Sequence, residues 1–483
     1  MSQNASTAES SNTNPFVYVV AAISALGGLL FGYDTGIIAS ALIFISKAFG
    51  LSSFAKEVVV SAILVGAIVG AILGGLLADR FGRRRIVITV AIIFAIGAVW
   101  AALSPSVGSL VASRFVLGLS VGGASSMVPV YIAELAPAKI RGGLVVLFQL
   151  MVAIGELISY LVGYALAGPG GWRWMFALAV IPAAILLVGM LFLPESPRWL
   201  MKRGLTDAAR SVLRRVRSDE KSVEDEINDI REVERQEEAG SWRDLRRPWV
   251  RPALVVGLGI AMFSQITGIN AMVYYAPTIL SSAGFGNSVA LLTGVGVGAL
   301  LVIGAAAGTL LVDRIGRRNI LLFLLPGAAL SMGVLGLAFL APDRTGTVGW
   351  IVVISLLAYI AFNGASIQVC VWLIPSEIFP LSVRGPAMSL STVFVWGFDL
   401  LVALTALSLI KAIGTTSVFW LYGLMNLVCW VFVYFLLPEP KGHSLEEIEI
   451  ALHQRGRFKT NLETMSAVNA PGVGKEGESR AEV

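Results

Sequence analysis

The chain contains few of the residue types that bind metals or form disulfides. Among its 483 residues are two cysteines, Cys370 and Cys429, both in apolar segments, and two histidines, His443 and His453, both in the polar C-terminal part. Two such cysteines build neither a disulfide framework nor a metal cluster, so we interpret them as packing residues. No Walker-type phosphate loop is present, which argues against ATP as an energy source. We therefore expect no metal, no cofactor and no enzymatic activity, and proton chemistry in the apolar segments must use carboxylates.

Charged residues are also scarce. They make up 14% of the chain, whereas a soluble protein usually has roughly 25%. Apolar runs of transmembrane length recur along most of the sequence, which predicts a polytopic membrane protein. The first run begins near Phe16, and it is too long and too acidic for a removable signal peptide. The net charge of +5 requires no nucleic acid partner, because basic residues of membrane proteins mark the cytoplasmic loops.

We expect twelve membrane-spanning helices, since a helix satisfies its own backbone hydrogen bonds inside lipid. The expected spans cover approximately residues 16–45, 57–78, 86–103, 106–132, 142–167, 174–193, 252–281, 288–312, 319–341, 348–373, 386–411 and 418–437. Basic residues cluster in alternate connections, such as 79–85 and 313–319, which predicts that both termini are cytoplasmic. The largest connection, 194–251, is rich in charges of both signs and has an apolar spacing that predicts short amphipathic helices.

Three motifs recur in the same order in both halves of the chain. "LLADRFGRRR" is echoed by "LLVDRIGRRN", "AELAPAKIRG" by "SEIFPLSVRG", and "LPESPR" by "LPEPKG". Two halves in the same orientation imply a pseudo-two-fold axis along the membrane normal, with a binding site near the midplane. The expected organisation is a disordered tail (1–15), an N-terminal bundle (16–193), a cytoplasmic linker (194–251), a C-terminal bundle (252–439) and a cytoplasmic tail (440–483). The part beyond about 458 is polar and is expected to be disordered.

The chain resembles the sugar porter branch of the major facilitator superfamily over about residues 16–450. The matching motifs are "GGLLFGYDTG", "DRFGRRR", "SRFVLGL", "AELAPAKIRG", "PESPRWL", "QITGINAMVYY", "DRIGRRN", "WLIPSEIFP" and "PEPKG". Each motif alone is weak evidence for the family, but nine motifs in the same order and at the proper spacing are specific evidence. The resemblance is nearest to bacterial proton-coupled sugar and myo-inositol symporters. It implies an all-α membrane protein with twelve transmembrane helices in two six-helix pseudo-symmetric bundles, the major facilitator fold.

Asp34 is the only acidic residue in the first apolar run. Such a residue costs about 2.5–3.5 kcal/mol at the centre of a membrane-spanning helix, so it normally faces a cavity and has a partner. Arg114 is the natural partner, and the resemblance implies a proton-coupling pair. Burial favours the neutral acid and Arg114 favours the carboxylate, so protonation can switch the pair. The alternative is a static ion pair that fixes helix packing.

Charged residues also surround the glycine turns at the expected cytoplasmic ends of the spans. They are Asp79, Arg83, Glu134, Arg141, Glu195, Arg198, Asp313, Arg317, Glu377, Arg384 and Glu439. One interpretation is topology alone, because Lys and Arg hold loops inside the cell. The resemblance adds a charge network that ties the two halves together in one state and so acts as a cytoplasmic gate.

A sugar site needs amides or carboxylates for hydroxyl groups and aromatic rings for the C–H faces. The candidates are Phe31, Gln149, Gln265, Asn270, Tyr274, Gln368, Trp372 and Trp396. The resemblance implies sugar contact or an aromatic lining role for all of them except Gln368, which is inferred from its location. For each residue the alternative is an interhelical hydrogen bond or a lipid-facing ring.

The chain departs from the family pattern at several candidate positions. Ser264 stands where the first of two adjacent Gln is usual, Leu301 replaces an Asn, and "SIQVCVW" replaces a Gly-Pro pair. Asp399 replaces an Asn, and Glu156 stands at a position that is usually neutral. The site thus loses amides and gains carboxylates. This change suits another polyol, a sugar derivative or a cationic hydroxylated solute as the substrate. The added carboxylates could instead supply extra proton sites. For Glu156, a further alternative is a structural hydrogen bond between two spans.

These observations predict a monomeric symporter that imports a sugar or polyol of the hexose, pentose or inositol class with protons. We expect it as a multi-pass protein of the inner or plasma membrane, with the solute, protons and the lipid bilayer as its partners. An uncoupled facilitator or an exporter is the first alternative. A transporter-like sensor is the second, but the short tail beyond Pro440 weighs against it.

Overall fold

The computed structural model describes residues 14–217, 219–236, 243–344, 346–454, 456 and 458–469. Within this part of the chain, twelve helical segments are long and apolar enough to cross a membrane. The helices that form them are α1 (Phe16–Phe49), α2 (Ser53–Phe81), α3 (Arg83–Leu103), α4 (Val107–Leu135), α5 (Ala138–Ala165), α6 and α7 (Gly171–Ala177 and Val180–Phe192), α11 and α12 (Arg251–Ile266 and Ile269–Ser282), α13 (Asn287–Ile315), α14 (Arg317–Ala338), α15 and α16 (Gly346–Gly364 and Ile367–Ile378), α17 (Arg384–Ile413) and α18 (Thr415–Leu436). The twelve predicted spans are confirmed to within a few residues.

Three of the spans consist of two helices, which the sequence analysis did not predict. α6 is separated from α7 by residues 178 and 179, α11 from α12 by Thr267 and Gly268, and α15 from α16 by residues 365 and 366. Gly268 has a φ of 95°, a left-handed conformation that glycine adopts without steric cost. A break inside a span exposes backbone groups that must find other partners, so these positions are restricted to the protein interior.

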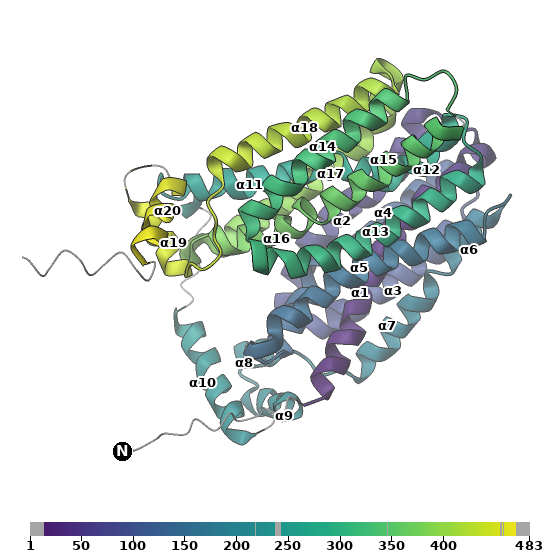
Figure 1. Ribbon diagram of the computed structural model, residues 1–483. Helices are drawn as coiled ribbons and strands as arrows, with labels where there is room; N and C mark the ends of the chain where they lie inside the picture. Colours follow the sequence, from purple (N-terminus) through teal and green to yellow (C-terminus); the bar gives the residue numbers. More distant parts are fainter. Residues whose placement is uncertain are drawn as a thin grey trace, which may run out of the picture.

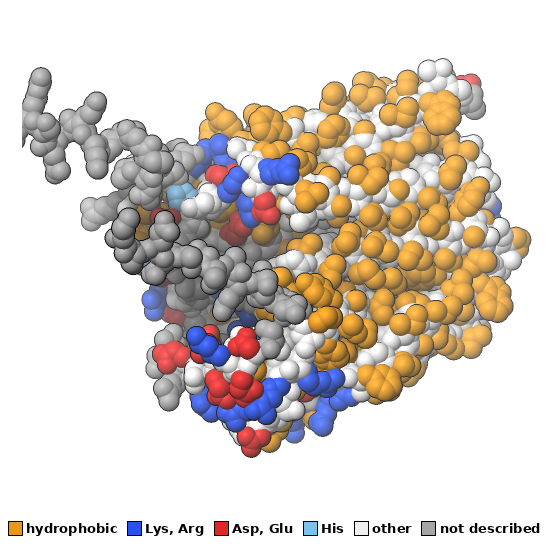
Figure 2. Space-filling model, turned by 60° about the horizontal axis from the view of Figure 1, so that its bottom comes forward, with side chains coloured by type: hydrophobic (Ala, Val, Ile, Leu, Met, Phe, Trp, Pro, Cys, Tyr) orange, Lys and Arg blue, Asp and Glu red, His pale blue; other side chains and the backbone are white. Residues whose placement is uncertain are grey.

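The chain forms two halves, α1–α7 and α11–α18, that lie side by side (Figure 1). They pack against each other chiefly through α5 with α13, α2 with α17 and α1 with α12. At one end lie the connections 79–85, 136–141, 313–319 and 379–384 and the short helices α8 (Pro197–Lys202), α9 (Thr206–Val216) and α10 (Glu220–Gln236). We call this the basic end. In Figure 2 charged side chains gather there, whereas apolar side chains cover the rest of the visible face.

The C-terminal part differs from the expected disordered tail. α19 (Leu445–His453) begins with a capping box in which Ser444 and Glu447 exchange hydrogen bonds, and α20 (Phe458–Asn469) follows it. Ile448 and Leu462 belong to the same apolar cluster as α11 and α14. The prediction of disorder beyond 458 is therefore wrong for 458–469, because a few apolar residues at helical spacing suffice where a preformed apolar surface is available. The remaining predicted tail residues, 1–13 and 470–483, lie outside the described residues.

Candidate functional site

Asp34 and Arg114 form an ion pair inside the N-terminal half. Nη1 of Arg114 lies 2.6 Å from Oδ2 of Asp34, and the two residues are 1% and 0% exposed. The guanidinium also lies over the ring of Phe176, with 5.9 Å from Cζ to the ring centre. Its Nε and Nη2 are buried without a hydrogen-bond partner among the described residues. The structure thus brings together the two residues that the sequence predicted as a pair, and it leaves donor capacity on Arg114 unused.

α1 and α5 approach very closely next to this pair. A Cβ atom on Gly32 would lie 1.8 Å from the carbonyl oxygen of Val152, so only glycine permits this approach. A Cβ on Gly36 would lie 3.1 Å from Cα of Glu156. The contact therefore places Glu156 on α5 beside the turn of α1 that carries Asp34. Two of the acidic residues singled out in the sequence lie on directly packed helices.

The break between α11 and α12 organises a polar cluster in the C-terminal half. Nδ2 of Asn270 donates to Oε1 of Gln265 at 2.7 Å, and Nε2 of Gln265 donates to Oγ of Ser264 at 3.0 Å. Gln368, on α16, donates to the carbonyl oxygen of Ser264 at 2.9 Å. The structure thus brings together three of the predicted solute-binding amides, those of Gln265, Asn270 and Gln368, from both sides of two helix breaks.

A second set of residues, which was not predicted from the sequence, forms hydrogen bonds with the backbone at the break. Tyr359 donates from its hydroxyl to the carbonyl oxygen of Thr267 at 2.7 Å, and Asn426 donates to the same oxygen at 3.2 Å. Asn363 donates to the Thr267 hydroxyl and to Oδ1 of Asn426, both at 3.3 Å. The signal was present as two amides inside apolar spans, where a polar group is retained only if it is satisfied. These residues hold the backbone that carries Gln265 and Asn270.

Asp399 and Trp396 lie one turn apart on α17. The hydroxyl of Tyr274 on α12 donates to Oδ2 of Asp399 at 3.0 Å, while Oδ1 and the indole Nε1 of Trp396 are buried without a hydrogen-bond partner among the described residues. The ring of Trp396 packs on Phe31 of α1 with 5.5 Å between centres. Predicted site residues from both halves therefore meet here, with one unused acceptor and one unused donor.

The remaining solute-binding candidates lie less centrally. Glu156 is half-buried, Gln149 is exposed on α5, and Trp372 is 36% exposed on α16. No hydrogen bond of the side chains of Gln149 or Trp372 is seen with the described residues. Their predicted contact with a solute stays a prediction.

Charged residues of the N-terminal half form one network at the basic end. Arg83 lies 3.2 Å from both Asp79 and Glu134. Oε1 of Glu195 accepts from the backbone N–H groups of Arg83 and Arg84 at 2.9 and 3.0 Å. Glu195 thus caps the N-terminus of α3, where free N–H groups and the helix dipole favour an anion. Gly82 precedes this helix with a φ of 99°.

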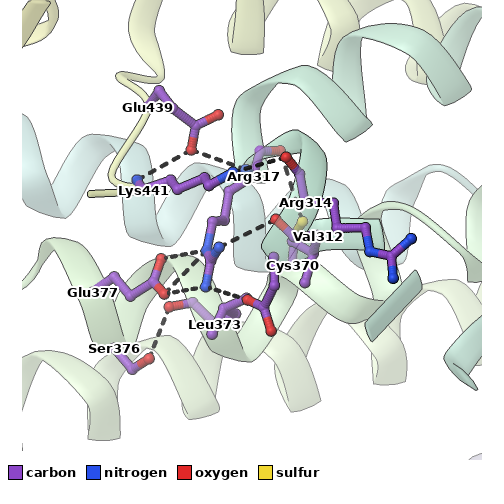
Figure 3. A network of polar contacts seen from close by, with 10 residues as sticks. Val312, Arg314, Arg317, Cys370, Leu373, Ser376, Glu377, Glu439 and Lys441 are labelled. Atoms are coloured by element: carbon purple, nitrogen blue, oxygen red, sulfur yellow. Dashed lines mark hydrogen bonds and ion pairs between the residues drawn. The ribbon is translucent and has the colours of Figure 1, made fainter. Parts of the chain in front are cut away.

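The C-terminal half repeats this arrangement (Figure 3). Arg317 lies 3.1 Å from Asp313 and 2.7 Å from Glu377. Glu439 accepts from the backbone N–H groups of Arg317 and Arg318 at 2.9 and 3.0 Å. Gly316 precedes α14 with a φ of 97°. The two networks match residue for residue, as the sequence repeat predicts.

The ion pairs seen among the described residues of these networks do not join the halves, and the expected link between the halves in one state stays a prediction. Each ion pair just described lies within one half, and Arg141 and Arg384 donate to backbone carbonyl oxygens of their own halves, those of Ala136 and Phe379. Arg198, at the start of α8, is exposed. In this conformation the halves instead meet through residues farther from the basic end. Glu57 on α2 and Ser408 on α17 form such a contact, and this buried acid was not predicted from the sequence.

The linker helices α9 and α10 are joined by surface ion pairs. Arg214 lies 2.5 Å from Glu220, and Arg210 lies 2.9 Å from Glu224. The hydrogen bonds from Arg214 lower the pKa of Glu220, and those same bonds raise the pKa of Arg214. Both groups are solvent-exposed, so these pairs orient the linker and contribute little stability.

Comparison with known proteins identifies the class of transporter to which this architecture belongs. The sequence pattern of the family described as "Sugar (and other) transporter" matches residues 20–452. The chain is 43% identical to a D-xylose transporter of Levilactobacillus brevis, over 91% of this chain and 96% of that protein. It is 36% identical to the major myo-inositol transporter of Bacillus subtilis, over 91% and 94% of the respective chains.

The fold matches solved structures of the xylose transporter XylE from E. coli. An inward-open conformation has a TM-score of 0.78 at 31% identity, covering 90% of this chain and 99% of that chain. The proton:xylose symporter XylE bound to 6-bromo-6-deoxy-D-glucose has a TM-score of 0.74 at 31% identity, covering 91% and 99%. The protein has the major facilitator fold, with twelve spans in two pseudo-symmetric bundles. It belongs to the sugar transporter family.

Proposed function

We propose that the protein is a proton-coupled symporter that imports a sugar or polyol of the hexose, pentose or inositol class by alternating access. The observation that carries the proposal is the Asp34–Arg114 ion pair, buried at 1% and 0% exposure in the N-terminal half. An isolated carboxylate would be costly there, and Arg114 offsets that cost only while the acid is ionised. Protonation of Asp34 releases Arg114 and changes how the surrounding helices pack. The related proteins named above, which include sugar and proton:xylose transporters, support this function.

The solute is held between the halves in this proposal. Gln265, Asn270 and Gln368 supply amide donors and acceptors for hydroxyl groups, and Asp399 and Trp396 supply an unused acceptor and an unused donor. Phe31 and Tyr274 provide rings for the C–H faces, as sugar sites require. Gln149 and Trp372 complete the site from α5 and α16, and Glu156 faces it from the N-terminal half.

The basic end is cytoplasmic in this proposal, because basic loops are retained on that side. Both termini are then cytoplasmic, the protein is a monomer in the inner or plasma membrane, and its lipid-facing surface is the apolar surface seen in Figure 2. The two networks at this end stiffen the ends of the spans within each half, so each half moves as a rigid body. In this proposal the networks contribute to the cytoplasmic gate by fixing the shape of the two half surfaces that move apart when the transporter opens.

The test is solute uptake by proteoliposomes with and without an inward proton gradient. A panel of hexoses, pentoses, inositols, sugar acids and amino sugars identifies the solute class. The proposal expects accumulation above the external concentration only when the proton gradient is present. Rapid exchange without any accumulation would instead establish an uncoupled facilitator, and binding without exchange would establish a sensor.

A further inference from the structure

Tyr160, on α5 of the N-terminal half, contacts the C-terminal half with its whole side chain. The residue is 0% exposed, and its hydroxyl donates a hydrogen bond of 2.7 Å to the carbonyl oxygen of Val273 on α12. α5 begins at the basic end and Tyr160 lies in its last two turns, near the opposite end. The hydrogen bond therefore joins the halves at the end where Glu57 and Ser408 also meet.

The carbonyl oxygen that accepts this bond lacks the donor that a helix normally supplies. In an α-helix the N–H of each residue donates to the carbonyl oxygen four residues earlier, and proline has no N–H. Pro277, four residues after Val273, lies inside α12. Val273 is buried, and a buried carbonyl oxygen without a donor is costly. The Tyr160 hydroxyl thus supplies, from the other half, the donor that Pro277 removes.

A second proline shows the same arrangement inside one half. Pro326 lies inside α14 and leaves the carbonyl oxygen of Leu322 without its helix donor. The indole Nε1 of Trp430 on α18 donates to this oxygen at 3.0 Å. Both helices belong to the C-terminal half, so this bond need not break when the halves move. The bond from Tyr160 crosses between the halves, so it must break if they separate at this end.

The ring of Tyr160 fits closely between helices of the C-terminal half. α13 packs directly against α5. A Cβ atom on Gly294 of α13 would lie 3.0 Å from Cδ1 of the ring, and one on Gly298 would lie 2.9 Å from Cδ2. The two glycines therefore leave the space that the ring occupies. Because the ring is already held there, little further side-chain freedom is lost when the hydroxyl bonds to Val273.

We propose that Tyr160 is a latch of the transport cycle. Its hydroxyl holds α12 against the N-terminal half while the end opposite the basic end is closed, and the bond breaks when that end opens. This inference rests on the proposed function, because alternating access requires that end to open. A neutral hydrogen bond suits a latch, since water replaces the phenol as donor to the Val273 oxygen once the cavity is open.

The latch acts on a helix that also carries predicted solute-binding residues. Asn270 and Tyr274 both lie on α12, and Val273 stands between them in the sequence. Movement of this part of α12 away from α5 changes the positions of both side chains relative to the N-terminal half. Release of the latch therefore alters the solute site in the same step that opens it.

Electron-resonance distance measurements on the solute-free protein test the latch. Spin labels are attached to cysteines introduced at exposed Ala167, just after α5, and exposed Ser282, the last residue of α12. Both native cysteines are buried. Tyr160→Phe removes only the hydroxyl, and it is compared with the wild type under conditions in which the wild type shows both the closed and the open distance. We expect the ratio of closed to open molecules to fall at least about fivefold.

Two control variants separate a latch from a general loss of packing. Trp430→Phe removes the donor at the other proline, within one half, so we expect a lower melting temperature with unchanged distances. Tyr164→Phe, at an exposed position on α5, should change neither. A fall in the ratio as large in Trp430→Phe as in Tyr160→Phe would show that any lost buried hydrogen bond has this effect, and the latch would be wrong.

Pro277→Ala tests the role of the freed carbonyl oxygen. Alanine restores an N–H that donates to Val273 within α12, so Tyr160→Phe should change the ratio much less in this background than in the wild type. An unchanged ratio in Tyr160→Phe, or the same fold-change in both backgrounds, would overturn the proposal. The measurement uses no solute and no proton gradient, so its failure is distinct from a failure of the proposed function, which uptake by proteoliposomes tests.

Discussion

Glu57 on α2 and Ser408 on α17 join the two halves far from the basic end. Oε1 of Glu57 accepts from the backbone N–H of Ser408 at 2.7 Å, and Oε2 accepts from its hydroxyl at 2.5 Å. Glu57 is 0% exposed. The contact closes the molecule at this end, while the charge networks at the basic end remain within their own halves. This combination agrees with the similarity to an inward-open transporter structure.

Removing the Glu57 side chain is expected to open this end. A hydrogen bond to a charged group contributes about 1.5–3 kcal/mol, so Glu57→Ala should lower the equilibrium constant between the closed and open states at least about tenfold. Spin labels at the exposed positions 54 and 411 measure the distance between α2 and α17 by electron resonance, and both native cysteines are buried. Ser408→Ala is the milder variant, because it removes only the hydroxyl. An unchanged distance distribution in Glu57→Ala would show that the contact does not hold the halves together.

The polar residues around the break between α11 and α12 should control solute affinity without touching the solute. Tyr359→Phe removes the hydroxyl that donates to the carbonyl oxygen of Thr267. We expect a loss of about 1–3 kcal/mol in stability, together with weaker solute binding, because Gln265 and Asn270 depend on this backbone. Tyr434→Phe, at an exposed position on α18, is the control. Thermal unfolding and a binding titration measure the two effects, and normal values of both in Tyr359→Phe would contradict this role.

The glycines that precede α3 and α14 should tolerate no side chain. Gly82 and Gly316 have φ values of 99° and 97°, and a Cβ on either would lie within 2.3 Å of a carboxylate oxygen, on Glu195 or Glu439 respectively. Gly82→Ala and Gly316→Ala are each expected to cost about 1–3 kcal/mol. Gly75→Ala is the matched control, because Gly75 is helical and has open space around it. Equal melting temperatures for Gly82→Ala and Gly75→Ala would show that the turn is not strained.

The charge networks should be energetically independent in this conformation. Arg83 pairs with Glu134, so we expect a coupling of about 0.5–3 kcal/mol between Arg83→Ala and Glu134→Ala. Arg83 and Glu377 belong to different halves, so the effects of their substitutions should add. Unfolding by denaturant in detergent gives both double-mutant cycles. A coupling between Arg83 and Glu377 as large as that within the N-terminal half would restore the network between halves that the sequence predicted.

The sequence predicts the spans well because long apolar runs and repeated basic motifs are strong signals. The Asp34–Arg114 pair could also be predicted, since a lone acid in an apolar run needs a partner. The helix break at Gly268 could not be predicted, because glycine also occurs in apolar runs that form continuous helices. Glu57 was overlooked because it stands at the start of a span, where an acid is ordinarily solvated. Which charged residues pair at the basic end depends on conformation, and sequence contains no direct signal for that.

The central claim is that Asp34 couples proton movement to solute import. The most direct measurement records proton and solute uptake together in proteoliposomes that contain the wild type or Asp34→Asn. We expect the wild type to take up protons with the solute and to accumulate it, whereas Asp34→Asn exchanges solute by counterflow without accumulating it. Full accumulation by Asp34→Asn, or solute uptake by the wild type without proton uptake, would contradict the account.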